Sequence, residues 1–239
     1  MNSTLKSILF AAVGLGLGIV VTSYTVWHMP RADDTRTERV VPAFGQSGTV
    51  ESFFLTADID GSGDVVAITG GTIADAFPEG IPALAEPHIE HGLALLTMIS
   101  DADADADADA DGKVVGFATE LQEMHEDTSV LSGKIMIHTY WTLILPGRGS
   151  IFLYQTENNW MVMKEVIRPS RTTGETWRGE RVSLNTNGPL PNGTGVIVGG
   201  TGEFAGIEGT FLEIGTLKGY KPPGSLHMSM ELRLNYGLE

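Results

Sequence analysis

Hydrophobic and polar residues alternate with a period of two along much of the chain after residue 48. Near its start, Phe53, Leu55, Ala57 and Ile59 share one face of an extended segment. Near its end, apolar side chains at positions 226, 228, 230 and 232 alternate with polar ones at 227, 229, 231 and 233. A strict period of two is typical of strands with two different faces.

Glycine, proline and aspartate punctuate these segments, as between residues 59 and 65, where the turn predicts a hairpin. No long stretch of this region has a helical period. A weak helical pattern over residues 81–96 is interrupted by Pro82, Pro87 and Gly92. The pattern therefore predicts strands at residues 49–59, 65–69, 93–99, 113–123, 134–145, 150–156, 160–167, 195–198, 209–216 and 225–234.

Several of these segments are apolar on both faces, most clearly residues 134–145. Trp141 and Leu143 lie on one face, and Met136, Tyr140 and Ile144 lie on the other. A barrel with a filled lumen and a covered outer wall explains both faces. The sequence thus predicts an all-β domain, an eight-stranded antiparallel β-barrel over residues 49–239, with a low-complexity insert at 101–111.

The first part of the chain has a different pattern. Residues 8–27 form an almost unbroken apolar run of the length that spans a bilayer, with Lys6 before it and Trp27 at its end. We predict a transmembrane anchor within residues 1–29, followed by a polar linker at 30–48. A cleaved signal peptide is the competing interpretation. Either one predicts a domain on the extracytoplasmic, periplasmic side.

Gly14 and Gly18 lie four residues apart within this apolar run. Small residues at this spacing let two membrane helices approach closely. Two interpretations stay open. The glycines pack against a partner helix, or they are present only because glycine is common in membrane helices.

Charge and composition narrow the class of function. Acidic residues outnumber basic ones 30 to 15, which excludes the basic surface that nucleic-acid binding needs. The chain has no cysteine, so disulfides and thiolate chemistry are excluded. The alternating Asp–Ala tract at 101–111 predicts a solvated loop, because an EF-hand register over it lacks the final glutamate at Ala118.

A glycine-rich segment, VIVGGTGEFAGIEGTF at residues 196–211, first suggests a dinucleotide fingerprint. The helix and βαβ unit that such a fingerprint requires do not follow it. The segment instead resembles the signature near the C-terminus of allene oxide cyclases and dirigent proteins, in which Gly199, Gly200 and Gly202 would form a turn between strands. The succession of strands from residue 49 to 234 fits the same families.

This resemblance implies an eight-stranded antiparallel barrel with an apolar lumen, often trimeric or dimeric. Members of these families cyclise or isomerise lipid-derived substrates, guide radical coupling or catalyse cycloadditions. Their catalytic residues match no position here one by one, so none is transferred. The chain departs from the pattern in its apolar N-terminus, its Asp–Ala tract and an insert at residues 158–192.

Candidate binding residues form a band of aromatic and methionine side chains over consecutive predicted strands. Core packing explains such a band, and so does a pocket for an apolar ligand. Glu165 shares the face of two of the methionines in the predicted strand and would be an acid or base if that face lined the lumen. The residues of the band are Tyr140, Trp141, Tyr154, Trp160, Met161 and Met163.

The histidines and acids give no strong metal motif; His88 and His91 with nearby glutamates form the one local cluster. We therefore predict no metal and no cofactor. The leading hypothesis is a membrane-tethered barrel that binds an apolar small molecule, as a candidate cofactor-independent cyclase or isomerase. The alternative is a non-catalytic accessory subunit of a membrane protein complex, with homo-oligomers or membrane proteins as partners.

Overall fold

A computed structural model describes residues 48–60, 64–69, 77–84, 92–101 and 112–238. The predicted anchor with Gly14 and Gly18, the linker up to residue 47, His88, His91 and residues 102–111 of the Asp–Ala tract lie outside these ranges. Among the described residues, no helix combines the length and the apolar character needed to cross a bilayer.

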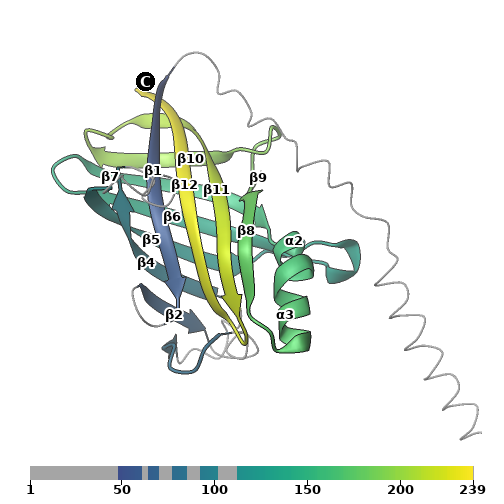
Figure 1. Cartoon of the computed structure of the whole chain (residues 1–239). Coiled ribbons are helices and arrows are strands. Elements are labelled where there is room, and N and C mark those ends of the chain that lie inside the picture. Colours follow the sequence, from purple (N-terminus) through teal and green to yellow (C-terminus); the bar gives the residue numbers. More distant parts are fainter. Residues whose placement is uncertain (1–47, 61–63, 70–76, 85–91, 102–111, 239) are drawn as a thin grey trace, which may run out of the picture.

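Eight antiparallel strands form a closed barrel (Figure 1). Around the wall they follow the order β1, β12, β11, β10, β7, β6, β5, β4, and β1 pairs with β4 at Phe54–Ser100 and Leu55–Ile99 to complete the ring. Their bounds are β1 Thr49–Ile59, β4 Gly92–Ser100, β5 Val114–Met124, β6 Met136–Leu145, β7 Gly149–Asn158, β10 Gly195–Gly202, β11 Ile207–Lys221 and β12 Ser225–Leu238. The predicted eight-stranded antiparallel barrel is confirmed.

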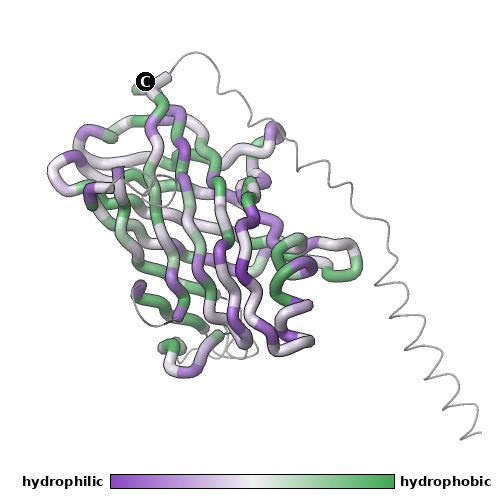
Figure 2. Tube along the Cα trace, viewed as in Figure 1, coloured by the Kyte–Doolittle hydropathy of each residue, from purple (hydrophilic) through white to green (hydrophobic). Residues whose placement is uncertain are grey.

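Alternation along these strands builds the interior, and it is visible in the hydropathy colouring of Figure 2. Every second residue of β6 from Trp141 to Leu145 is fully buried, while Tyr140, just before them, is exposed. The core cluster gathers inward side chains from all eight strands, among them Phe53, Leu153 and Phe211. The apolar lumen is therefore packed with large side chains over much of its length.

Four short strands extend the sheet beyond the ring. β2 (Val65–Thr69) pairs with β4, and β3 (Ala83–Leu84) pairs with β2. The predicted hairpin between residues 49–59 and 65–69 is wrong, because β1 takes β12 and β4 as its partners instead of β2. β8 (Trp177–Leu184) pairs with β11, and β9 (Thr186–Gly188) pairs with β7. The short helix η3 (Val130–Ser132) lies between β5 and β6.

The prediction of a strand at residues 160–167 is wrong. This stretch is helical, as α2 (Trp160–Val162) and η4 (Met163–Ile167), and it continues into α3 (Arg168–Thr173). Val162, Val166 and Ile167 follow helical spacing and pack with Leu217 and Tyr220 of β11. Tertiary burial of that stripe prevails over the short apolar alternation, and Gly174 ends the helix in a left-handed conformation.

The weak helical candidate at residues 81–96 is also not helical where it is described, since it contributes to β3 and β4. The strand β8 has no counterpart in the predicted set. Its residues are mostly exposed and polar, so it lacks the apolar alternation on which strand prediction depends.

Candidate active site in the barrel lumen

The predicted aromatic and methionine band is divided among three places. Trp141 points into the lumen and is 1% exposed. Tyr140 and Tyr154 lie on the outer wall, where their rings stack at a centroid separation of 5.2 Å. Trp160, Met161 and Met163 belong to the helical segment, and all three are half-buried. Trp141 is the member of the band that faces the lumen.

Glu165 does not line the lumen. It sits on the helix, its side chain is 47% exposed, and it forms an ion pair with Arg181 of β8 at 3.1 Å. The interpretation of Glu165 as an ordinary surface charge is therefore the correct one, and the lumen acid that it was expected to provide comes from other residues.

Three glutamates lie inside the barrel instead: Glu120 on β5, Glu157 on β7 and Glu213 on β11. They are at most 4% exposed, and a carboxylate oxygen from each lies within 4.8 Å of the others. We call them the lumen carboxylate cluster. Each occupies an inward position of its strand, in line with Ala118, Leu153 and Phe211.

Glu213 has the richest set of donors. Trp141 donates its indole N–H to Oε2 at 3.2 Å, and Asn185 donates its amide to Oε1 at 2.7 Å. The amide of Gln155 also donates to Oε2 through a short hydrogen bond. Donors to a carboxylate favour its ionised form, so Glu213 is the member best prepared to carry negative charge.

Glu157 also accepts a hydrogen bond from the side-chain amide of Gln155. Thr139 donates its hydroxyl to Oε1 at 2.5 Å, and Gln155 donates to Oε1 at 2.9 Å. Gln155 is itself held by Thr186, whose hydroxyl donates to Oε1 of Gln155 at 2.6 Å. The glutamine thus bridges two carboxylates and fixes their separation.

Glu120 has the fewest partners. Gln122 donates to its Oε1 at 2.7 Å, and no other hydrogen bond to its side chain is found among the described residues. Burial raises the pKa of Glu120 well above its usual range, and the charges of Glu213 and Glu157 raise it further. Glu120 is therefore the member of the cluster that holds its proton most firmly.

The other two pKa values are also raised. Burial, followed by the charge of Glu213, raises the pKa of Glu157 to about 8. Burial raises the pKa of Glu213 as well, against the opposing effect of Asn185, Gln155 and Trp141. Because the three environments differ, protons leave the cluster in sequence, with Glu213 first and Glu120 last.

This arrangement supports two kinds of chemistry. A protonated and an ionised carboxyl side by side can act as general acid and general base. Three carboxylates could instead supply oxygen ligands to a hard cation. The amide, hydroxyl and indole donors directed at Glu157 and Glu213 already occupy oxygens that a cation would need, which favours proton chemistry.

Sequence reasoning missed the lumen carboxylate cluster, although a signal was present. Glu120 and Glu213 stand at positions whose parity matches buried apolar neighbours, and Glu157 follows a strand predicted to end at residue 156. A charged residue in register with a core face indicates either a misplaced strand or a functional acid. Asn185 and Thr186 carry no such signal, since Asn185 lies between β8 and β9 and Thr186 begins β9, and neither strand was predicted.

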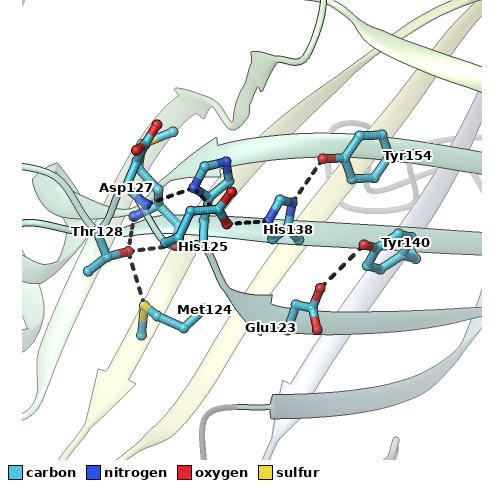
Figure 3. A network of polar contacts seen from close by, with 10 residues as sticks. Glu123, Met124, His125, Asp127, Thr128, His138, Tyr140 and Tyr154 are labelled. Carbon is cyan, nitrogen blue, oxygen red and sulfur yellow. Dashed lines mark hydrogen bonds and ion pairs between the residues drawn. The ribbon is translucent and has the colours of Figure 1, made fainter.

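The outer wall carries a second polar group, drawn in Figure 3. His138 on β6 and His125 after β5 stack at a centroid separation of 4.1 Å. His138 bonds Tyr154 through Nδ1 at 2.8 Å and Glu126 through Nε2 at 3.2 Å. We call His125, Glu126 and His138 the outer histidine cluster. It lies at the end of β5 on the outside of the barrel (Figure 3).

The turn between β10 and β11 comes later than predicted. Gly199, Gly200 and Gly202 belong to β10 and pair with β7, and the turn is formed by residues 203–206. Gly202, the last residue of β10, has φ +65°, and a Cβ there would lie 2.2 Å from the carbonyl oxygen of Arg148. The guanidinium of Arg148 pairs with Glu51 of β1 and with Glu203 of the turn, each at 2.5 Å.

Comparison with known proteins gives a likeness of fold. No family model matches the chain, and no curated protein matches it. The chain is similar to the pterocarpan synthase dirigent protein GePTS1, with 13% identity, a TM-score of 0.42, and coverage of 80% of this chain and 84% of that one. For the pterocarpan synthase dirigent protein PsPTS1 the values are 14%, 0.44, 80% and 95%.

The closed antiparallel barrel that the resemblance implies is confirmed by the strand pairings of the chain itself.

Proposed function

We propose that the barrel binds an apolar small molecule and acts on it by acid–base chemistry, as a cofactor-independent cyclase or isomerase. The observation that supports this proposal is the lumen carboxylate cluster, three buried glutamates with graded hydrogen bonding beside an apolar wall. Burying three carboxyl groups is unfavourable, so their retention inside a small barrel calls for a role beyond packing.

Each glutamate has a role that follows from its surroundings. Glu120 holds its proton and would donate it to a substrate oxygen or double bond. Glu213, supported by Trp141, Asn185 and Gln155, would accept a proton or stabilise developing positive charge. Apolar lumen residues that move apart to admit a flexible substrate would restrict its conformations, which lowers the entropic part of the barrier.

The proposal is tested by removing the acid while preserving its shape. Glu120→Gln should remove one protonated-carboxyl component of the infrared spectrum at pH 7, since a neutral amide replaces the acid, while the component from Glu157, whose pKa is raised to about 8, remains. Binding is followed with N-phenyl-1-naphthylamine, a neutral apolar fluorophore, and with the fluorescence of Trp141, obtained as wild type minus Trp141→Phe.

The fluorophore should quench Trp141 in both the wild type and Glu120→Gln, because the substitution leaves the apolar wall intact. A wild type that shows no protonated carboxyl at pH 7 would contradict the acid–base role. Failure of the fluorophore to perturb Trp141 at any concentration below its solubility would contradict lumen binding.

We also propose that residues 8–27 tether the barrel to a membrane with the domain on the extracytoplasmic side. The support is the length of the apolar run and the flanking Lys6 and Trp27. The full chain should stay with membranes after a carbonate wash, whereas a chain that begins at Arg31 should not. Recovery of a mature protein that lacks residues 1 to about 28 would identify a signal peptide instead.

One observation favours the alternative, an accessory subunit of a membrane complex. Apolar side chains are exposed on the outer wall along adjacent strands β4, β5, β6, β7 and β10, and such a continuous face is typical of a contact surface. Its members are Met98, Leu121, Tyr140, Phe152 and Val198.

The alternative predicts that a defined companion chain co-migrates with the native protein in mild detergent. Phe152→Glu should release that companion while leaving the lumen carboxylate cluster and the fluorophore binding unchanged. A particle mass equal to a multiple of this chain would instead indicate a homo-oligomer, and a monomeric mass would contradict the subunit role.

A further inference from the structure

We propose that the outer histidine cluster is a binding site for a first-row divalent transition cation, with Zn²⁺ as the reference ion. His125, Glu126 and His138 each offer one ligand atom, and these atoms lie within 4.8 Å of one another. The site is separate from the lumen carboxylate cluster and does not depend on the acid–base function.

The separations between ligand atoms suit a tetrahedral ion. Oε2 of Glu126 lies 3.2 Å from Nε2 of His138 and 3.5 Å from Nδ1 of His125. With Zn–N and Zn–O bonds of about 2.0–2.1 Å, tetrahedral ligands are about 3.3 Å apart. Two edges of the ligand triangle therefore have the required length already, and the third, between the two histidine nitrogens, is no longer than 4.8 Å.

The two histidines are held in place while the glutamate is free to move. The side chains of His125 and His138 are 14% and 17% exposed, and their rings stack at 4.1 Å. The side chain of Glu126 is 79% exposed. A rigid pair of imidazoles with a mobile, solvent-facing carboxylate allows an ion to enter from solvent and leaves a coordination position for water.

Tyr154 supplies the outer support that a ligating histidine usually has. Its hydroxyl lies 2.8 Å from Nδ1 of His138, so Nε2 faces the ion position. Because a hydroxyl can both donate and accept, it keeps its hydrogen bond when the proton moves from Nε2 to Nδ1 upon metal binding. His138 can therefore become a ligand without losing this partner.

His125 has to give up one hydrogen bond in order to bind the ion. The backbone N–H of Asp127 donates to its Nδ1 at 2.9 Å in the metal-free arrangement. Asp127 is exposed, so this N–H can return to water when the ion takes the lone pair. Two imidazoles and one carboxylate select zinc and its neighbours over calcium or magnesium, which prefer oxygen ligands alone.

The test uses the full chain in detergent, free of any affinity tag, titrated with Zn²⁺ by calorimetry and with Co²⁺ by visible absorption. We expect one ion with histidine ligands per chain and the intense bands of tetrahedral Co²⁺. Glu126→Gln and His138→Gln should each abolish these bands, and Tyr154→Phe should weaken binding by about 10–100-fold.

His227→Gln is the matched control, because His227 also contacts a carboxylate, that of Asp58, at the surface of the barrel. It should leave Zn²⁺ affinity unchanged, as should Glu120→Gln in the lumen. Proton resonances of the His125 and His138 rings should shift on adding Zn²⁺ to the wild type. Unshifted rings, or equal Zn²⁺ affinity in wild type, Glu126→Gln and His138→Gln, would overturn the proposal.

Discussion

The lumen carboxylate cluster and the outer histidine cluster both contain glutamate, but their surroundings shift its pKa in opposite directions. Inside, burial raises the pKa of Glu120 well above its usual range. Outside, a backbone hydrogen bond, followed by His138 and His125, lowers the pKa of Glu126. Glu120 and Glu157 of the lumen cluster lie on the inner face of the wall formed by β5, β6 and β7, and the outer histidine cluster lies on its outer face.

The difference shows that the parity of a residue along a strand decides its chemistry. Thr139 and His138 are neighbours in sequence, yet Thr139 faces Glu157 in the lumen and His138 faces Glu126 in solvent. A shift of one residue in the register of β6 would exchange these surroundings.

The largest effect is expected inside, from Gln155→Leu. The substitution keeps the volume but removes the donor shared by Glu157 and Glu213 and the acceptor of Thr186. We expect the free energy of unfolding to fall by about 3–5 kcal/mol, because two buried carboxyls lose a partner. Urea denaturation measures it. Tyr154→Phe on the outer wall should cost less than about 1 kcal/mol, and equal losses would break the comparison.

A substitution at the barrel rim lowers the stability of the fold without touching a residue of either cluster. Gly202→Val should lower the free energy of unfolding by about 1–3 kcal/mol, since φ is +65° and the added Cβ meets the Arg148 carbonyl. Thermal melting measures the loss, and no binding of NAD(P) is expected before or after the change. Gly237→Ala, where a Cβ meets no atom within 4 Å, is the control and should be nearly neutral.

The pH dependence of the free energy of unfolding should come from the lumen carboxylate cluster. The pKa of Glu157 is about 8 in the folded state and near 4.5 when exposed, so the folded state holds the extra proton between these values. Stability from this group is complete below pH 4.5 and is lost as the pH rises toward 8, at about 1.4 kcal/mol per pH unit. Denaturation series from pH 5 to 8 should show this slope, and Glu157→Gln should flatten it.

The smallest effect is expected outside, from Tyr140→Phe. Its hydroxyl donates to Glu123 over 3.3 Å in an exposed position, and water replaces that bond easily. The free energy of unfolding should change by less than about 0.5 kcal/mol. A larger loss, measured by the same denaturation series, would mean that the outer polar contacts stabilise the barrel as much as the inner ones.

The sequence predicts the barrel well because the apolar alternation within each strand shows which of its faces is buried. In β1 and β12 the apolar alternation is regular, and these strands pair in the structure from Thr49–Tyr236 to Ile59–Leu226. The prediction fails where burial comes from an added element. The helix α2–η4–α3 packs against Leu217 and Tyr220 of β11, and its stripe of Val162, Val166 and Ile167 is too short to stand out from a strand pattern.

The candidate site is harder to predict for a different reason. Glu120, Glu157 and Glu213 are far apart in sequence, and they meet because β5, β7 and β11 point them across one lumen. The outer histidine cluster depends on the pairing of β5 with β6, which places Glu123 opposite His138 and brings His125 close by. Local patterns carry no information about such cross-strand neighbours.

The pairing of β1 with β12 has a consequence for how the chain folds. β1 begins at Thr49 and its main partner is β12, which ends at Leu238, so the two edges come from opposite ends of the domain. The hairpins from β4 to β7 join strands that are neighbours in sequence and can form while the ribosome is still adding residues. The ring cannot close until the last strand has been made. Until then the three lumen glutamates face water, and they acquire their shifted acidity only in the finishing step of folding.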